Sequence, residues 1–378
     1  MPLLMLSALL HALVGWRLLP ALSATPWAAA LLSGVLVVSA VLLPQGLRPP
    51  RWSSRGAVAL LSWSGYLFMG FFSTLFVLTL LRDAGGAVLW VASWAWPGVD
   101  SATADAARWT AQAVPLAAAA VTLWGLVNAR RTAAVVSVDV PITNLPAGLH
   151  GFTIAQITDV HVGQTIRRGY LEAIVRKVNA LQADLVAVTG DLVDGSVREL
   201  GVHVAPLSQL VSTHGTYFVT GNHEYYSGAV SWITELRRLG LTVLMNEHVV
   251  LGPPAAQLVL AGVADHGAHH FEPSHRSDPQ GALAGAPSGA SVRVLLAHQP
   301  RTAEAAEQAG FDLQVSGHTH GGQFWPWNFF VPLQQPFTAG LHRLRRLWVY
   351  TSRGTGYWGP PKRLGAPSEI TRLRLVAA

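Results

Sequence analysis

The sequence predicts a region of about four membrane-spanning helices followed by an α/β domain. Only nine of the 46 charged side chains lie in residues 1–129, whereas 14 of the 15 histidines lie at or after residue 150. Hydrophobic residues make up 51% of the chain and charged residues 12%, against roughly 25% charged in ordinary soluble domains. The chain therefore divides into a charge-poor part and a His-rich part.

Four apolar stretches, uncharged except for Arg17 in the first, predict the membrane spans. A bilayer core needs about 20 apolar residues per helix. The stretches cover residues 2–22, 27–43, 56–81 and 109–128, the first one including Arg17. Residues 84–96 are apolar, Trp-rich and short, so we expect them to lie at the membrane interface. Transporters usually carry buried acids, and these spans have none, which favours an anchor.

The arginines of the loops predict the orientation. Short loops rich in Lys and Arg favour the cytoplasm. The second loop carries Arg48, Arg51 and Arg55, and Arg130 and Arg131 follow the fourth stretch. Both termini and the His-rich part are therefore predicted to be cytoplasmic.

Composition also excludes several classes of function. Because the chain has no cysteine, disulfide frameworks, Cys-based zinc sites and cysteine nucleophiles are ruled out. The net charge is +6, but 24 of the 26 basic residues are arginine and no basic run exceeds two residues. Nucleic-acid-binding proteins carry basic patches or stripes, so no nucleic acid is expected as a partner.

Residues 130–149 are predicted to form a linker and a first strand, and residues 150–378 an α/β domain. Short apolar runs alternate there with helical patterns and Gly-bounded turns. Strands are predicted at residues 153–157, 185–189, 216–220, 258–263, 292–297, 313–316, 347–351 and 370–375. Helices are predicted at residues 169–181, 200–212, 229–239 and 302–308. Residues 265–290, rich in Gly, Pro, Ser and His, are predicted to form a flexible loop.

Polar side chains directly follow five of the predicted strands. They are Asp159 and His161, Asp191 and Asp194, Asn222 and His223, His298, and His318 and His320. Ligand sites of α/β sheets lie at the carboxyl ends of the strands. Carboxylate, imidazole and carboxamide groups without a thiolate suit Mn, Fe or Zn. These side chains offer more ligands than one ion needs, so two divalent ions that share a carboxylate fit the set of ligands better.

These motifs resemble the calcineurin-like metallophosphoesterase superfamily. They are D-x-H at Asp159, GDxxD at Gly190, GNHE at Gly221, the single His298, and GHTHGG at Gly317. The resemblance covers roughly residues 150–376, and the four spans resemble those of its transmembrane, bacterial-type members. It implies a four-layer α-β-β-α sandwich domain on an integral protein of the bacterial inner membrane, hydrolysing phosphodiester or phosphomonoester bonds.

The resemblance also implies a role for each motif residue. One metal ion would be held by Asp159, His161, Asp191 and His320, and the second by Asp191, Asn222, His298 and His318. Asp191 would bridge the two ions, and a metal-bridging hydroxide would be the nucleophile. His223 would donate a proton to the leaving oxygen or stabilise charge, and Asp194 would orient His223.

Neighbouring residues receive more modest predictions. Thr158 and Thr189 are expected to pack at strand ends. Glu224 is expected to begin a helix and to lie outside the site. Arg353 is expected either to contact a substrate phosphate or to form a structural ion pair.

The substrate is left open at this stage. The aromatic segment 324–330 lines a pocket, lies at the bilayer surface or is simply a packed loop. If it lies at the bilayer surface, the substrate would be amphipathic, such as a phospholipid or a lipid-linked nucleotide. One alternative function is a pyrophosphatase acting on a lipid-linked nucleotide. A second, from a different class, is a non-catalytic metal-dependent sensor domain. The sequence predicts no particular protein partner.

Overall fold

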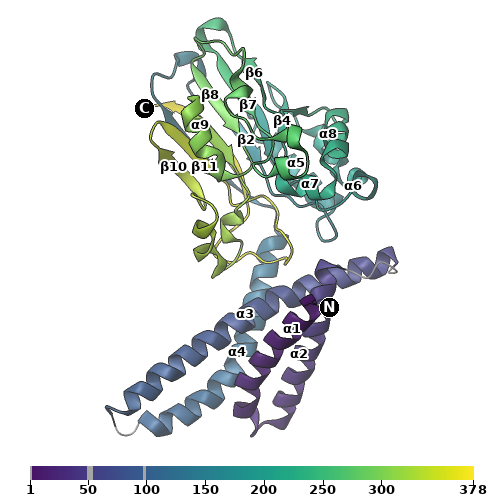
Figure 1. The fold of residues 1–378 in the computed structure, drawn as a ribbon, viewed down its shortest axis with the longest axis vertical. Helices are drawn as coiled ribbons and strands as arrows, with labels where there is room; N and C mark the ends of the chain where they lie inside the picture. The colour runs from purple at the N-terminus through teal and green to yellow at the C-terminus, as the bar shows by residue number, and fades with distance from the viewer. Residues whose placement is uncertain (1, 49–53, 97–98) are drawn as a thin grey trace. The chain divides into compact units, whose positions relative to one another are not determined.

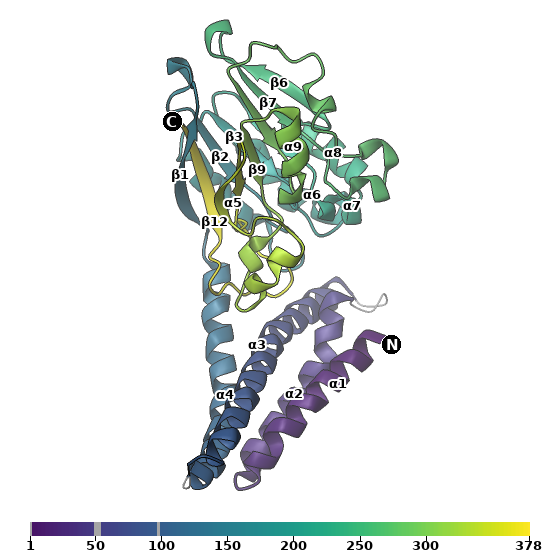
Figure 2. The ribbon, with the colours of Figure 1, turned by 60° about the vertical axis from the view of Figure 1, so that its left-hand side comes forward.

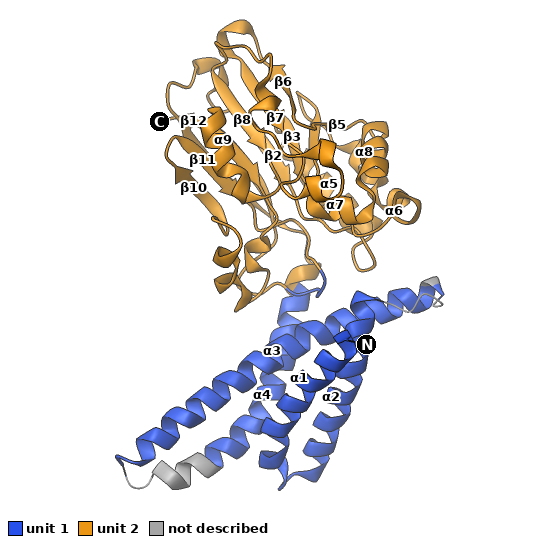
Figure 3. Ribbon diagram, viewed as in Figure 1, with its two compact units in different colours: residues 1–127, 359–362 blue, residues 128–358, 363–378 orange. Residues whose placement is uncertain are grey.

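The computed structural model describes residues 2–48, 54–96 and 99–378, so Arg51 of the orientation argument lies outside the described residues. Two compact units make up the chain. The first consists of residues 1–127 and 359–362, and the second of residues 128–358 and 363–378 (Figure 3). The short segment 359–362 thus belongs to the helical unit, although it comes late in the sequence.

Four helices form the first unit (Figure 2). They are α1 (Pro2–Leu18), α2 (Pro26–Leu47), α3 (Arg55–Ser93) and α4 (Val99–Arg130), which continues into the second unit. Each is long and apolar enough to cross a membrane. Residues 84–93, part of the segment 84–96 that is predicted to lie at the membrane interface, continue α3 as a helix. Neither Gly85 nor Gly86 interrupts α3, and this stretch contains no proline that would remove a backbone donor.

Polar side chains help to join the helices. His11 Nε2 lies 2.8 Å from Ser39 Oγ on α2, its Nδ1 lies 2.7 Å from the carbonyl of Ser7, and its ring stacks on Phe72 of α3 at 3.6 Å. His11 is therefore a satisfied, buried histidine that connects three helices.

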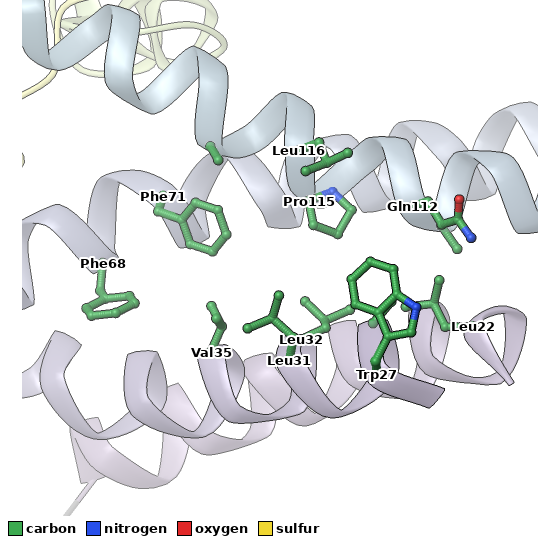
Figure 4. A pocket seen from close by; sticks show the side chains of 13 residues that line it. Leu22, Trp27, Leu31, Leu32, Val35, Phe68, Phe71, Gln112, Pro115 and Leu116 are labelled. Atoms are coloured by element: carbon green, nitrogen blue, oxygen red, sulfur yellow. The ribbon is translucent and has the colours of Figure 1, made fainter. Parts of the chain in front are cut away.

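An apolar cavity of about 430 Å³ lies among α2, α3 and α4. Figure 4 shows Trp27, Leu31, Phe71 and Pro115 on its wall, with Gln112 contributing an amide group. Such a lining suits hydrocarbon, as expected inside a membrane unit.

Two six-stranded sheets form the centre of the second unit. The first has the order β1-β12-β2-β3-β4-β5, and the second β10-β11-β9-β8-β7-β6. The strands of the first sheet are β1 (Ala134–Ile142), β2 (Thr153–Ile157), β3 (Leu185–Thr189), β4 (Thr216–Val219), β5 (Thr242–Val243) and β12 (Glu369–Ala377). Those of the second are β6 (Glu247–Leu251), β7 (Leu258–Gly262), β8 (Val292–Leu296), β9 (Leu313–Ser316), β10 (Gly340–Leu344) and β11 (Leu347–Thr351).

Helices cover the outer faces of both sheets (Figures 1 and 2). The helices are α5 (Arg168–Asn179), α6 (Val197–Val204), α7 (Asn222–Ser227), α8 (Ala229–Arg238) and α9 (Ala303–Ala309). A core between the sheets includes Ile154, Leu260 and Leu373, each fully buried. The faces of α5 and α8 pack on the first sheet, and α9 packs on the second. The architecture is the predicted four-layer α-β-β-α sandwich.

Every predicted strand is present, with ends that differ by up to two residues. The prediction missed β5, β6, β10 and the short helix α7. These elements are short or half exposed, so they lack the continuous apolar pattern of a buried strand. The predicted helix 200–212 begins earlier, at Val197, where Ser196 and Glu199 form a capping box. Residues 265–290 join β7 to β8 and contain three 3₁₀ turns.

Candidate metal centre

Five parallel strands bring the predicted ligands to one place. Strands β2, β3 and β4 are parallel neighbours in the first sheet, and β8 and β9 are parallel neighbours in the second. The loops after them are joined by backbone hydrogen bonds, from Asp159 to Gly190 at 3.0 Å and from Gly317 to His298 at 2.9 Å. The predicted ligands therefore converge where the carboxyl ends of both sheets meet.

The ligand atoms form two adjoining groups. Asp159, His161 and His320 make up the first, and Asp191, His298 and His318 the second. In the first group, His161 Nε2 and His320 Nε2 are 3.0 Å apart, and His320 Nε2 is 3.5 Å from Asp159 Oδ1.

Asp191 lies between the two groups. Its Oδ2 is 3.1 Å from His298 Nε2 in the second group and 3.9 Å from His161 Nε2 in the first. This is the position that a bridging carboxylate requires.

Asn222 is also a predicted ligand of the second ion. Its Oδ1 is buried and accepts no hydrogen bond from any residue that the structure describes. A buried oxygen without a partner costs about 1–3 kcal/mol unless something binds it. A divalent cation would satisfy Asn222 Oδ1, and the donor set of carboxylate, imidazole and carboxamide fits Mn, Fe or Zn.

The backbone at the site is strained. Asp159, His161, Asp191, His318 and His320 all have positive φ, between 51° and 72°. Such conformations cost of the order of 1–3 kcal/mol each and persist at functional sites where the surroundings enforce them. Five strained ligands on three loops indicate a site that is built for function rather than for stability.

Two glycines allow the loops to approach the carboxylates. A Cβ on Gly221 would lie 2.3 Å from Asp191 Oδ1, and a Cβ on Gly317 would lie 2.2 Å from Asp159 Oδ2. Any side chain at either position would displace a candidate ligand.

His223 and Asp194 form a pair beside the first group. Asp194 Oδ1 lies 2.7 Å from His223 Nδ1 and 2.9 Å from His161 Nδ1. Burial alone lowers the pKa of His223, but the bond to Asp194 and the charge of Asp191 outweigh it and raise that pKa to about 9. The same two histidines hold the pKa of Asp194 below its usual range despite burial. With Nδ1 engaged by Asp194, Nε2 of His223 is left to face a substrate.

Glu224 contributes to the site, which corrects the sequence analysis. Its carboxyl accepts hydrogen bonds from the backbone N–H groups of Gly221 at 2.6 Å, Asp191 at 2.9 Å and Leu192 at 2.8 Å. Burial and the neighbouring charge of Asp191 raise the pKa of Glu224 to about 7. Glu224 fixes the loop of Asp191 against the loop of Asn222. The available signal was its place three residues after the cap Gly221, where a Glu side chain can accept from the backbone N–H of the cap residue.

Thr158, expected only to pack at a strand end, also contacts a candidate ligand. Its hydroxyl lies 2.7 Å from Asp159 Oδ2 and 2.9 Å from the carbonyl of Thr189. It therefore orients a candidate ligand.

Two arginines behind the site are structural. Arg353 forms an ion pair with Glu369 at 2.9 Å, the second of its two predicted roles. Arg363, fully buried, donates to the carbonyls of His320 at 2.9 Å and Arg353 at 2.7 Å. Arg363 thus supports the loop that carries His320.

Comparisons with known proteins agree with this geometry. The profile of the calcineurin-like phosphoesterase family matches residues 152–322. A metallophosphoesterase of Aquifex aeolicus is 32% identical over 228 residues, which cover 60% of this chain and 85% of that protein. The chain belongs to the calcineurin-like phosphoesterase family.

Two further relatives carry the word transmembrane in their names. The cattle protein named transmembrane protein with metallophosphoesterase domain is 43% identical over 266 residues, 67% of this chain and 60% of that protein. The zebrafish protein of the same name is 39% identical over 69% of this chain and 61% of that protein. The chain thus spans about three fifths of the length of these relatives.

Proposed function

We propose that this protein is a membrane-anchored phosphoesterase that uses two divalent metal ions to hydrolyse phosphodiester or phosphomonoester bonds. The observation that carries the proposal is the position of Asp191, whose Oδ2 lies within 3.1 Å of one ligand group and 3.9 Å of the other. Membership of the family and the four apolar helices support it.

Each ion would have its own set of ligands. Asp159, His161, Asp191 and His320 would hold the first ion, and Asp191, Asn222, His298 and His318 the second. When bound, such ions lower the pKa of a water molecule so that hydroxide is available near neutral pH as the nucleophile. Mn, Fe and Zn all suit these donors.

His223 would act on the leaving group. Its Nδ1–H is held by Asp194 at 2.7 Å, so the ring orientation is fixed and Nε2 can carry the proton to be transferred. A pKa raised to about 9 keeps His223 protonated at neutral pH, as an acid requires. Asp194 serves as its positioning residue.

The His223–Asp194 pair also favours an enzyme over a sensor. A metal-dependent sensor needs the ligands alone, whereas a charged histidine that is held by Asp194 next to the ligand His161 has a use in catalysis. A partly buried, charged imidazole is costly to maintain without such a use.

The cytoplasmic side of a bacterial inner membrane is our proposal for the catalytic unit. Arg48, Arg130 and Arg131 lie in the loops and ends that the positive-inside rule assigns to the cytoplasm. A C-terminal alkaline phosphatase fusion should therefore be inactive in a bacterial host, and strong activity would reverse the orientation.

A substrate screen tests the function. The full chain, purified in detergent and loaded with Mn, is assayed against phosphomonoesters, phosphodiesters and lipid pyrophosphates. We expect hydrolysis of at least one ester class, with a preference for the lipid-linked forms if the substrate is amphipathic. Turnover confined to pyrophosphates would replace the phosphoesterase by the pyrophosphatase, and no turnover in any class would favour the sensor.

A further inference from the structure

Two exposed aromatic side chains contact the ring of His223, and a third contacts one of these two. Tyr226, Phe271 and Trp358 are 63%, 56% and 48% exposed. The ring of Tyr226 lies 5.1 Å from that of His223 at 64°, and the ring of Trp358 lies 5.9 Å from it at 72°. Phe271 continues the surface, 5.6 Å from Tyr226. We call these three residues the aromatic wall.

Three segments far apart in the sequence build this wall. Tyr226 comes from α7, Phe271 from the connection between β7 and β8, and Trp358 from the stretch after β11. Large aromatic groups favour burial, so two exposed rings beside one histidine, extended by a third exposed ring, indicate a surface that a ligand covers.

Hydrogen bonds and ring contacts with neighbouring residues hold the aromatic wall in place. The backbone N–H of Trp358 donates to Gln323 Oε1 at 2.8 Å, and the carbonyl of Trp358 accepts from Gln323 Nε2 at 2.9 Å. Phe271 packs on Tyr225 at 5.9 Å, and the hydroxyl of Tyr225 lies 2.9 Å from His275 Nδ1. Both ends of the wall are thus fixed by buried or partly buried partners, which is the support that a specific binding surface needs.

We propose that the leaving group of the substrate carries a planar aromatic ring that packs against Tyr226 and Trp358. This inference rests on the proposed function. In the hydrolysis, a water molecule loses one proton to the solvent and its oxygen forms a new P–O bond. The P–O bond to the leaving group breaks, His223 gives its proton to the departing oxygen, and the solvent returns a proton to His223. The leaving group must therefore lie on the side of His223, where both rings stand at steep angles to the imidazole. Aromatic rings that pack edge to face or offset gain about 0.5–1.5 kcal/mol beyond area burial.

Esters that differ only in the leaving group test the proposal. Benzyl, cyclohexylmethyl and ethyl phosphates, or their methyl diesters, are compared with the detergent-solubilised full chain by chromatography of the released alcohol. Benzyl and cyclohexylmethyl groups have similar bulk, but only the benzyl group is planar and aromatic. We expect kcat/KM for the benzyl ester to exceed that for the cyclohexylmethyl ester about tenfold. Equal values would show a merely apolar surface, such as one that rests on lipid, and would overturn the proposal.

Variants locate the effect. Tyr226→Ala and Trp358→Ala should each lower the ratio of kcat/KM for the benzyl ester to kcat/KM for the ethyl ester by about tenfold. Tyr226→Phe retains the ring and should restore most of the benzyl preference. Phe329→Ala removes an exposed aromatic residue outside the wall and serves as the matched control.

The outcomes separate the two proposals. Hydrolysis of the ethyl ester without a benzyl preference, or equal losses on both esters in the alanine variants, overturns the aromatic leaving group and leaves the phosphoesterase intact. No hydrolysis of any ester by the metal-loaded wild type overturns the phosphoesterase and the inference with it. A competitive benzylphosphonate should also bind the wild type more tightly than cyclohexylmethylphosphonate, a result that does not depend on turnover.

Discussion

Replacing His223 by glutamine separates proton donation from metal binding. The side chain of His223 is bonded to Asp194 at 2.7 Å and belongs to neither of the two ligand groups around Asp191. Glutamine keeps a polar group of similar reach but cannot transfer a proton. Loss of a general acid costs about 10²–10⁴ in rate, or about 3–5 kcal/mol.

How far the rate falls in His223→Gln depends on the leaving group of the substrate. An alkoxide needs a proton when it departs, whereas 4-nitrophenolate does not. We therefore expect His223→Gln to lower kcat for an alkyl ester by at least a hundredfold and for a 4-nitrophenyl ester by much less. The bound metal, measured by mass spectrometry of the purified protein, should stay at the wild-type level.

A histidine elsewhere provides the control. His342 lies on β10 and is exposed, so His342→Gln should change neither turnover nor metal content. Loss of metal from His223→Gln would instead make His223 a ligand, since His161, Asp194 and His223 also lie close enough to hold an ion. Equal losses on both esters would refute the role as an acid.

Three further predictions concern the ligands and their supports. Asp191→Asn removes the charge shared by both ligand groups and should lower the metal content and abolish turnover, whereas full activity after chelation and Mn readdition would contradict the bridging role. Asp194→Asn should retain the metal within tenfold in affinity yet lower kcat about 10–100-fold, checked by steady-state kinetics beside metal titration. Glu224→Gln replaces one of the two oxygens that accept from backbone N–H groups by an NH2 group, which cannot accept. It should lower the thermal midpoint of the full chain and weaken metal binding about tenfold, and an unchanged midpoint would show that Glu224 is not structural.

The ligand positions could be predicted from the sequence because each follows a strand directly. A short strand with a buried apolar pattern is visible in sequence, and so is the polar residue at its end, as at Asp159 and His298. Parallel pairing then brings these ends together without further information.

The supports could not be predicted in the same way. Glu224 acts on the backbone N–H groups of Asp191 and Leu192, more than thirty residues earlier, and a backbone contact leaves no pattern in the side chains. The aromatic wall is a similar case, since Tyr226, Phe271 and Trp358 meet only once both sheets are formed. Local sequence patterns report local periodicity and not such long-range proximity.

The extent of α3 shows a further limit. Residues 84–96 have the length and tryptophan content of a separate segment, but the helix α3 continues into them as far as Ser93. Composition indicates the surroundings that a segment prefers, whereas the end of a helix depends on a cap or a proline.

The metal stoichiometry of the purified full chain tests the central claim most directly. Two divalent ions per chain are expected after loading with Mn, with phosphoesterase activity that disappears on chelation and returns when Mn is added back. A single ion per chain, or hydrolysis that is unaffected when all metal has been removed, would contradict a two-metal phosphoesterase.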